Sequence, residues 1–449
     1  MTRSTGAVVV ALLTLVTAAC GGWPAAPAAK PRPAPRPPAE YRALWVDAFH
    51  PGIHSRAEVD QLVDTARRAN VNALFVQVRK AADAYYLDSM EPVALDIAGP
   101  PTFDPLAYLL RRAHGTAPRI EVHAWVNTFA VSTRSPLFAY LGPYWGNRTG
   151  TGQTAGYLDP GDPDVRAYTH AVLMHLARRY DIDGLHLDFV RYPEGGGWGY
   201  SPGAVDAFDA ATGRAGAPDP SDPAWSQWRR DQVTVFVRDL AGDLARTRPR
   251  VKLSAAVIAW GAGPPAVGWQ ATSAYREVYQ DWDRWLREGI LDMAVAMNYD
   301  MAWSPRTARW FEQWIEWEKD NQHGRRVVVG VGAWCNYPED TLAQIRRALA
   351  PSTAGNRAAG VAIYSYASTS PYGTTDYYED AAAAAVLPRQ PYAAGLDPGG
   401  LRHRAQQFNG SFWRLLTAKG SYADPVVGRI STEPVFPRPA PVPDLAWKR

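Results

Sequence analysis

The feature that most constrains this chain is a regular alternation of short apolar segments with amphipathic ones, which begins at Tyr41. The apolar segments have the length and composition of buried strands. Eight of them follow one another, at 42–47, 72–79, 120–127, 183–193, 252–260, 291–300, 326–334 and 360–366. The fourth contains Leu185 and Leu187 between polar neighbours and ends in Asp188, Arg191 and Tyr192.

Each apolar segment is followed by a stretch with helical spacing of its apolar residues. The eight predicted helices cover 58–70, 104–114, 163–180, 225–247, 279–288, 309–319, 339–349 and 376–386. Eight strand–helix pairs are what a (β/α)8 (TIM) barrel needs. The alternative is an open doubly wound sheet, which normally carries a glycine-rich phosphate turn after its first strand. Residues 48–52 contain no such turn, so the sequence predicts the α/β TIM barrel.

The N-terminal 40 residues have the character of a targeting segment and a tether. An apolar run, Ala7–Val16, is followed by Thr17-Ala18-Ala19-Cys20, small residues before a cysteine as in a bacterial lipoprotein cleavage box. Thr17 departs from the usual leucine, and a plain secretory signal is the alternative. We therefore expect a signal peptide over 1–20, lipidation at Cys20 and a Pro/Ala-rich tether over 21–40. The expected location is extracytoplasmic and membrane-anchored, or secreted if the lipobox fails.

The predicted barrel domain spans 41–386, and the strand–helix rhythm stops after it. Residues 387–449 are Pro-rich, and we expect an irregular extension with one possible helix near 400–417. This extension would pack on the barrel or trail from it.

Composition excludes some classes of function. The formal net charge is +3 and no Lys/Arg run or RNA-binding motif is present, so we expect no nucleic-acid partner. Cys20 and Cys335 are the two cysteines, which leaves the mature domain no internal disulfide and no Cys/His metal site. The chain has 18 Trp and 22 Tyr. Such a number favours aromatic platforms for sugar rings, although core packing accounts for many of them.

Polar and aromatic side chains gather at the ends of the predicted strands. In a TIM barrel these ends meet at one face, where the active site lies. Burying so many polar groups is costly unless they have a task. The set comprises Asp47, Gln77, Arg79, Asn127, Asp188, Arg191, Tyr192, Trp260, Asn298, Tyr299, Asp300, Trp334 and Tyr364.

Asp188 and Asp300 are the best pair of carboxylates for glycoside hydrolysis, which uses one as acid and one as nucleophile or base. Arg191 or Arg79 beside Asp188 would keep it ionised. An aromatic rim would give Asp300 a drier setting and raise its pKa towards that of an acid. The expected rim residues are Trp145, Trp198, Trp260 and Trp303. The simpler alternative is a helix cap at Asp47, and a cap or substrate hydrogen-bond acceptor at Asp300.

The strand motifs resemble a known family. They are Arg42-Ala43-Leu44-Trp45-Val46, Gln77-Val78-Arg79 with Asp83-Ala84-Tyr85-Tyr86, Glu121 to Asn127, Asp183 to Asp188 with Arg191-Tyr192-Pro193, and Met297-Asn298-Tyr299. Over residues 40–370 the chain resembles the glycoside-hydrolase-like family 10 lipoproteins of bacteria, which are (β/α)8 barrels. The resemblance implies cleavage of a glycosidic bond, in peptidoglycan or another amino-sugar polymer.

Two departures from the family pattern concern the strand ends. Asp300 stands where many relatives carry Thr, which counts against its catalytic role, and Ala367 stands where relatives often carry Asp. Chitinase-type barrels share the Met297-to-Asp300 motif, but Val190 occupies the place of their catalytic glutamate. A chitinase mechanism is therefore disfavoured. The pair of aspartates instead resembles the retaining scheme of α-galactosidase barrels.

These observations predict a surface-tethered glycoside hydrolase with Asp188 as nucleophile or charge stabiliser and Asp300 as acid/base. The predicted substrate-binding residues are Asp47, Arg79, Asn127, Arg191, Tyr192, Trp260, Asn298, Tyr299 and Trp334. No cofactor or metal is expected. The rival class is a non-catalytic carbohydrate-binding barrel that kept the cleft and lost an acid. A third class, a structural surface lipoprotein, predicts no sugar affinity.

Overall fold

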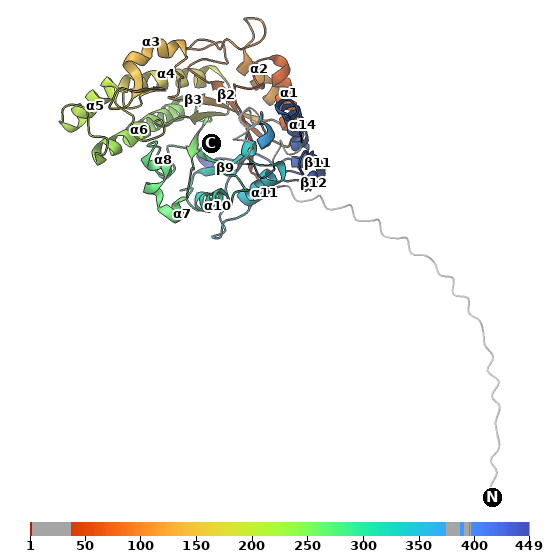
Figure 1. The fold of residues 1–449 in the computed structure, drawn as a ribbon. Helices are drawn as coiled ribbons and strands as arrows, with labels where there is room; N and C mark the ends of the chain where they lie inside the picture. The colour runs from red at the N-terminus through yellow and green to blue at the C-terminus, as the bar shows by residue number, and fades with distance from the viewer. Residues whose placement is uncertain (2–36, 374–386, 390–394, 396, 449) are drawn as a thin grey trace. The chain divides into compact units, whose positions relative to one another are not determined.

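Eight parallel strands close into a barrel in the computed structural model (Figure 1). The strands are β1 (Tyr41–Val46), β2 (Ala73–Arg79), β3 (Glu121–Asn127), β6 (Gly184–Asp188), β7 (Lys252–Ile258), β8 (Met293–Asn298), β9 (Arg326–Gly332) and β10 (Gly360–Tyr364). Their order around the barrel is β1-β10-β9-β8-β7-β6-β3-β2. The structure describes Met1, 37–373, 387–389, 395 and 397–448. All eight predicted strands, and with them the TIM-barrel fold, are confirmed.

The barrel closes because β1 pairs in parallel with both β2 and β10. At the closing seam Tyr41 lies opposite Gly360, whose φ is +152°. A Cβ at this position would lie 2.1 Å from the carbonyl oxygen of Tyr41. Glycine is therefore required where the last strand meets the first.

Helices on the outside cover the barrel (Figure 1). Those predicted from the sequence are α1 (Arg56–Arg68), α2 (Pro105–His114), α4 (Pro163–Arg179), α6 (Pro223–Thr247), α9 (Trp282–Arg287), α10 (Pro305–Asp320) and α11 (Pro338–Leu349). Asp104 caps α2 by accepting from the N–H of Ala107, with Pro105 at the first position. The predicted helix at 376–386 lies outside the described residues.

The long loops after β3 and β6 contain elements that the sequence pattern did not reveal. The first carries α3 (Pro136–Trp145) and a hairpin of β4 (Gly146–Arg148) and β5 (Thr154–Leu158). The second carries α5 (Pro202–Thr212). Two single-turn helices, α7 (Pro264–Val267) and α8 (Ser273–Arg276), follow β7.

The C-terminal extension is more regular than predicted. It contains α14 (Pro398–Thr417) and an antiparallel hairpin of β11 (Gly420–Asp424) and β12 (Gly428–Thr432). The helix predicted near 400–417 is confirmed, whereas the expectation of an irregular extension is wrong for 420–432. The two short strands after α14 form a regular hairpin by pairing with each other, which the proline-rich composition of the segment did not indicate.

After the hairpin, the chain runs beneath the barrel at the amino ends of its strands. Asn72, which precedes β2, donates through Nδ2 to the carbonyl of Ala440 at 3.0 Å. Asp292, which precedes β8, accepts from Trp447 Nε1 at 2.6 Å and forms an ion pair with Lys448 at 2.8 Å. The extension thus packs on the barrel, with contacts at the face opposite the carboxyl ends of the strands.

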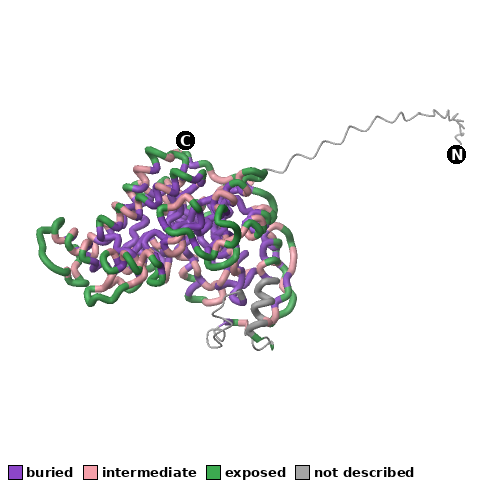
Figure 2. Tube along the Cα trace, turned by 90° about the horizontal axis from the view of Figure 1, so that it is seen from above, coloured by how far each residue is buried: buried purple, intermediate pink, exposed green. Residues whose placement is uncertain are grey.

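The core has two layers, and Figure 2 shows the buried residues concentrated at the centre of the molecule. Alternate strand residues such as Trp45, Phe75 and Val295 fill the barrel interior, and their neighbours pack outwards against the helices. His186 points inwards, accepts from Trp45 Nε1 at 3.0 Å and bonds to Ser254 at 2.9 Å. Burial holds the pKa of His186 well below its ordinary value, so it is neutral. Among the described helices, none is both long enough and apolar enough to cross a bilayer.

Candidate active site

A cavity of about 690 Å³ lies at the carboxyl ends of the barrel strands. Its lining joins polar groups at strand ends with aromatic rings. The residues used below are Trp45, Asp47, Phe49, Gln77, Lys80, Trp125, Asn127, Tyr157, Asp188, Phe189, Arg191, Trp260, Met297, Tyr299, Trp334 and Tyr364. Eight of the predicted strand-end residues come together here with Arg191: Asp47, Gln77, Asn127, Asp188, Trp260, Tyr299, Trp334 and Tyr364.

Asp188 is the last residue of β6 and lines the cavity. Its Oδ1 accepts from the N–H of Phe189 at 2.7 Å. Phe189 has a φ of +50°, a left-handed conformation that is strained for an aromatic residue and turns the chain sharply after the strand. Burial raises the pKa of Asp188 to about 6, and the charge of Arg191 offsets part of that rise. We predicted that an arginine would keep Asp188 ionised; the charge of Arg191 does lower its pKa, but burial outweighs this effect.

Arg191 lies over the aromatic walls of the cavity. Its guanidinium carbon is 4.6 Å from the ring centre of Phe189 and 5.3 Å from that of Trp260. The side chain is 4% exposed. Nε and Nη1 are buried without a hydrogen-bond partner. The structure thus places an almost buried cation, with unused donors, in the wall of the cavity.

The floor of the cavity is aromatic. Tyr299 stacks on Tyr364 with a centroid distance of 5.1 Å, and both rings meet Trp45 edge-on at 6.1 Å. Trp125 packs edge-on against Tyr364 at 6.4 Å. Aromatic faces and edges of this kind suit the apolar faces of sugar rings.

Asp47 and Asn127 are held by local hydrogen bonds at the ends of β1 and β3. Asp47 Oδ1 accepts from the N–H groups of Phe49 and His50 at 2.9 and 3.1 Å, and bonds to His50 Nδ1 at 2.7 Å. This bond to Asp47 raises the pKa of His50. Asp47 therefore shapes the β1 loop, and Ser55 is the residue that caps α1. Asn127 accepts from Gln77 Nε2 at 3.0 Å and donates to the carbonyl of Lys80 at 2.6 Å.

Arg79 is not among the residues that line the cavity. It is fully buried and donates from Nε and Nη2 to the two oxygens of Glu91, each at 2.6 Å. Nη1 donates to the carbonyls of Asn127 and Thr128. The register between β2 and β3 shifts between Gln77 and Arg79. This bulge turns Arg79 away from the inward-facing side chains. From outside the cavity, the arginine links the end of β2 to the end of β3.

Tyr192 is also outside the cavity lining. Its ring is fully buried and packs edge-on against Tyr279 at 5.4 Å. Burial raises the pKa of its hydroxyl well above the ordinary value. It contributes to the packing of the loop after β6.

Asn298 and Asp300 lie behind the cavity wall, not in its lining. Asn298 Nδ2 donates to both carboxyl oxygens of Glu318 on α10, at 3.0 and 3.1 Å. Burial raises the pKa of Glu318 to about 8 and that of Asp300 to about 7. Asp300 Oδ2 and Asn298 Oδ1 are buried without a hydrogen-bond partner. The predicted rise in the pKa of Asp300 is confirmed in direction, but burial behind β8 causes it.

Of the expected aromatic rim, only Trp260 lines the cavity. Trp145 packs on Tyr168 at 5.4 Å, and Trp198 donates to the carbonyl of Glu194 at 2.7 Å. Trp303 donates to the carbonyl of Cys335 at 3.1 Å. These three rings hold loops and helices in place.

The family model described as glycosyl hydrolase-like 10 matches residues 40–337, about two thirds of the chain. The chain belongs to this family. The matched region carries every cavity residue named above except Tyr364.

Two relatives of this glycosyl hydrolase-like 10 chain bear names that state an activity. "Glycosyl hydrolase YngK" of Bacillus subtilis is 24% identical over 325 residues, which are 65% of this chain and 60% of the relative. "Glycosyl hydrolase DigH" of Escherichia coli K12 is 24% identical over 304 residues, 62% of this chain and 65% of the relative. The chain thus matches less than two thirds of the length of each.

Two solved structures share the barrel of this glycosyl hydrolase-like 10 chain. The PgaB glycoside hydrolase domain of Bordetella bronchiseptica has a TM-score of 0.52 and 18% identity, over 73% of this chain and 94% of that one. The α-L-fucosidase isoenzyme 2 of Paenibacillus thiaminolyticus has a TM-score of 0.51 and 12% identity, over 83% and 49%. At these identities the likeness concerns the fold.

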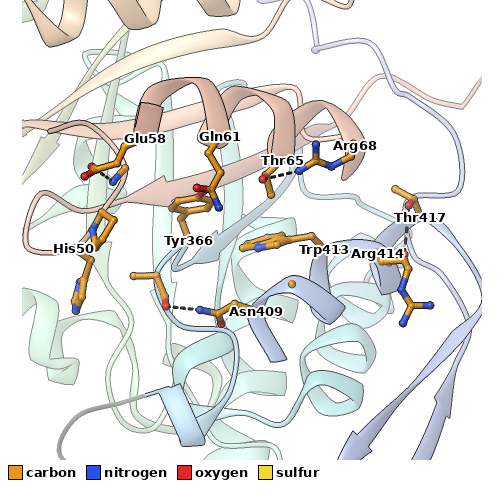
Figure 3. Close-up of a pocket in the computed structure, with 14 residues that line it drawn as sticks. His50, Glu58, Gln61, Thr65, Arg68, Tyr366, Asn409, Trp413, Arg414 and Thr417 are labelled. Atoms are coloured by element: carbon orange, nitrogen blue, oxygen red, sulfur yellow. Dashed lines mark hydrogen bonds between the residues drawn. The ribbon is translucent and has the colours of Figure 1, made fainter. Parts of the chain in front are cut away.

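A second cavity, of about 860 Å³, lies on the outer wall of the barrel between α1 and α14 (Figure 3). Its one lining carboxylate, Glu58, accepts from the N–H groups of Gly52 and His54 at 2.7 and 3.1 Å. Asn409 is bonded to the carbonyl of Ala367 at 2.7 Å. Because these polar groups hold the surrounding loops, the cavity at the strand ends is the better candidate in this glycosyl hydrolase-like 10 barrel.

Several cavity residues received no role from the sequence. Trp45 and Trp125 stand two residues before Asp47 and Asn127, so the period of two along a strand places them on the same inward face. Tyr157 belongs to the unpredicted hairpin and had no such signal. Within the described part of the chain, no group of three or more His, Cys, Asp or Glu side chains could hold a metal ion.

Proposed function

We propose that this chain is a glycoside hydrolase that cleaves glycosidic bonds in a peptidoglycan-like cell-wall polymer or another extracellular glycan. The observation that carries the proposal is Asp188, a carboxyl group at a strand end in a cavity walled by aromatic rings. Membership of the glycosyl hydrolase-like 10 family supports it. The cavity volume is in the range of pockets that hold one or a few sugar rings.

In this proposal Asp188 is the nucleophile or the group that stabilises the positive charge of the transition state. The strained turn at Phe189 fixes its carboxyl group, and the neighbouring Arg191 favours its ionised form. Asn127, Trp260, Tyr299 and Trp334 would position the sugar rings.

The acid/base partner is the predicted Asp300, whose pKa of about 7 suits an acid at neutral pH. Since Asp300 does not line the cavity, this role requires its side chain to turn towards the substrate. Asp47 is the competing partner because it does line the cavity.

The test is incubation of the purified protein with peptidoglycan strands, with and without their peptides, followed by mass analysis of the products. New reducing ends that disappear with Asp188→Asn support the hydrolase. Tight binding without any product supports the rival, a carbohydrate-binding barrel. Absence of both contradicts both readings.

We further infer that the protein is extracytoplasmic and that Cys20 carries a lipid that anchors it to the cell membrane. The small residues before Cys20 and the Pro/Ala-rich stretch that follows support this inference. Cys20 lies outside the described residues. Labelling of cells with a palmitate analogue should mark the wild type and not Cys20→Ser. Equal labelling of the two would contradict lipidation there, and release of unlabelled protein would indicate a plain secretory signal.

A further inference from the structure

Arg191 differs from the other buried arginines of the described chain. Arg42, Arg79, Arg229 and Arg230 are each less than 9% exposed, and each donates to carbonyl, carboxylate or side-chain oxygens. Arg191 is 4% exposed, and its Nε and Nη1 have no hydrogen-bond partner. A buried guanidinium group with unused donors is costly, because it has lost its water without gaining an acceptor.

The neighbours of Arg191 do not remove this cost. Asp188 influences it electrostatically, but no ion pair within 4.0 Å joins the two side chains. The rings of Phe189 and Trp260 offer their faces, not acceptors. The hydroxyl of Tyr157 bonds to Arg191, but Nε and Nη1 stay without a partner. Because Nε and Nη1 of Arg191 find no acceptor in the protein and Arg191 lines a cavity, an acceptor on a bound ligand could satisfy them.

The second cation of the cavity is already engaged. Lys80 Nζ donates to Asp96 at 2.8 Å and to the carbonyl of Ala48 at 3.1 Å. The carboxylate of Asp47 is likewise engaged by His50 and two backbone N–H groups. Arg191 is thus the cavity cation with donors to spare among the described residues.

We propose that Arg191 forms an anion subsite that binds a carboxylate carried by the sugar beside the bond to be cleaved. This deepens the proposed function and rests on it, since it names acidic glycans as the preferred substrates. A guanidinium group matches a carboxylate in shape and charge, and a pairing in a largely buried site is strong. The carboxylate can belong to a sugar ring, as in a hexuronic acid, or to an ether branch, as in the lactyl group of peptide-free peptidoglycan.

The test compares glycans that differ in the carboxylate alone. The probes are peptide-free peptidoglycan oligosaccharides and hexuronate oligosaccharides, each with a counterpart whose carboxylates are reduced to primary alcohols. Binding is measured by calorimetry with the full-length protein carrying Asp188→Asn, so that no probe is consumed. We expect at least one acidic probe to bind tenfold or more tightly than its reduced form. The probe that shows the difference identifies the source of the carboxylate.

The same measurement in an added Arg191→Gln variant should abolish the preference by weakening only the acidic probe. Arg191→Lys keeps the positive charge without the planar donors, so it should retain part of the preference for the acidic probe. It also provides a second test if the Gln variant fails to fold. The matched control is Lys80→Gln, which should leave the ratio of affinities unchanged. Equal affinity for the acidic and reduced probes, or a ratio that survives Arg191→Gln, overturns the subsite.

The wild-type protein, assayed for turnover on the same probes, separates this inference from the proposed function. Turnover without a preference for acid contradicts the subsite alone. A preference in binding without turnover by the wild type supports the subsite and contradicts the hydrolase.

Discussion

Two carboxyl groups near strand ends differ in the direction they face. Asp188 ends β6 and faces the inside of the barrel, whereas Asp300 follows β8 and faces outwards. Asp188 faces the cavity, beside a guanidinium group that favours its charge. Asp300 lies behind the wall near Glu318, and burial raises the pKa of both of these carboxyl groups without a neighbouring cation that pairs with Asp300. The end of β6 therefore places a carboxyl group in the cavity, whereas the carboxyl groups near the end of β8 are buried outside it with raised pKa values.

The difference follows from the alternation of side chains along a strand. In β8 the inward residues are Met293, Val295, Met297 and then Tyr299, so Asn298 and Asp300 fall on the outward face. In β6 the inward residues are His186 and Asp188. A carboxyl group at a strand end is therefore a candidate catalytic group only if it falls among the alternate residues that face the inside of the barrel.

The largest effect is expected at Asp188. Asp188→Asn removes the charge without changing the shape, and turnover should fall on the order of 10⁴-fold while binding persists. Single-turnover rates with a soluble glycan measure this. The matched control is Asn127→Asp, which changes the charge of another inward strand end and should leave detectable turnover. Wild-type rates in Asp188→Asn would contradict the assignment.

Substitution of Asp300 tests whether a carboxyl group that faces away from the cavity can still act in catalysis. If Asp300 is the acid, Asp300→Asn should lower turnover about 10²- to 10³-fold, and substrates with good leaving groups should recover most of it. Asp47→Asn is measured beside it. A loss in Asp47→Asn with full activity in Asp300→Asn would transfer the acid role to the inward residue.

Glu318 should weaken the fold at neutral pH. Its pKa is raised from 4.5 to about 8, so the unfolded chain releases a proton that the folded chain retains, and stability falls as pH rises from about 4.5 to 8. Glu318→Gln is neutral and can both accept from and donate to Asn298. It should raise the free energy of unfolding by about 3 kcal/mol at pH 7 and have little effect at pH 4. Urea unfolding at both pH values measures the difference, and a pH-independent change would contradict a buried neutral acid.

The ionisation of Asp188 should also lower the stability of the fold as the pH rises, but over a narrower pH range than that of Glu318. Its pKa is raised from 3.8 to about 6, so stability falls as pH rises between these values and is constant above them. Asp188→Asn should therefore stabilise the protein by up to about 3 kcal/mol at pH 7 and by little at pH 3.5. The gain should level off above pH 6, whereas that of Glu318→Gln continues to pH 8. If the two variants showed the same dependence of stabilisation on pH, the predicted difference between the pKa values of Asp188 and Glu318 would be wrong.

The sequence predicted the barrel well because strand and helix periods are local signals. It also predicted Asp188 and the inward strand ends, since each follows a clear strand. Arg79 has the inward parity, and only the register shift after Gln77 takes it out of the cavity. Such a bulge depends on the pairing of two strands and leaves no mark in either alone.

Partners from distant segments were also beyond the sequence. Glu318 lies in the last turn of the amphipathic helix α10, yet its carboxyl group is buried and accepts from Asn298, 20 positions earlier in the chain. Glu91 meets Arg79 from a loop without regular structure. These pairings arise when the helices and loops pack on the barrel, so they require the tertiary fold.

The C-terminal extension pairs with the residues that lead into the barrel. The N–H of Glu40 donates to the carbonyl of Pro441 at 3.1 Å, so the incoming chain and the final segment run together beneath the amino ends of the strands. The cavity of the candidate active site lies at the carboxyl ends, on the opposite face of the barrel. The chain therefore enters the barrel on the face opposite the cavity, which leaves the mouth of the cavity clear of the first residues of the domain.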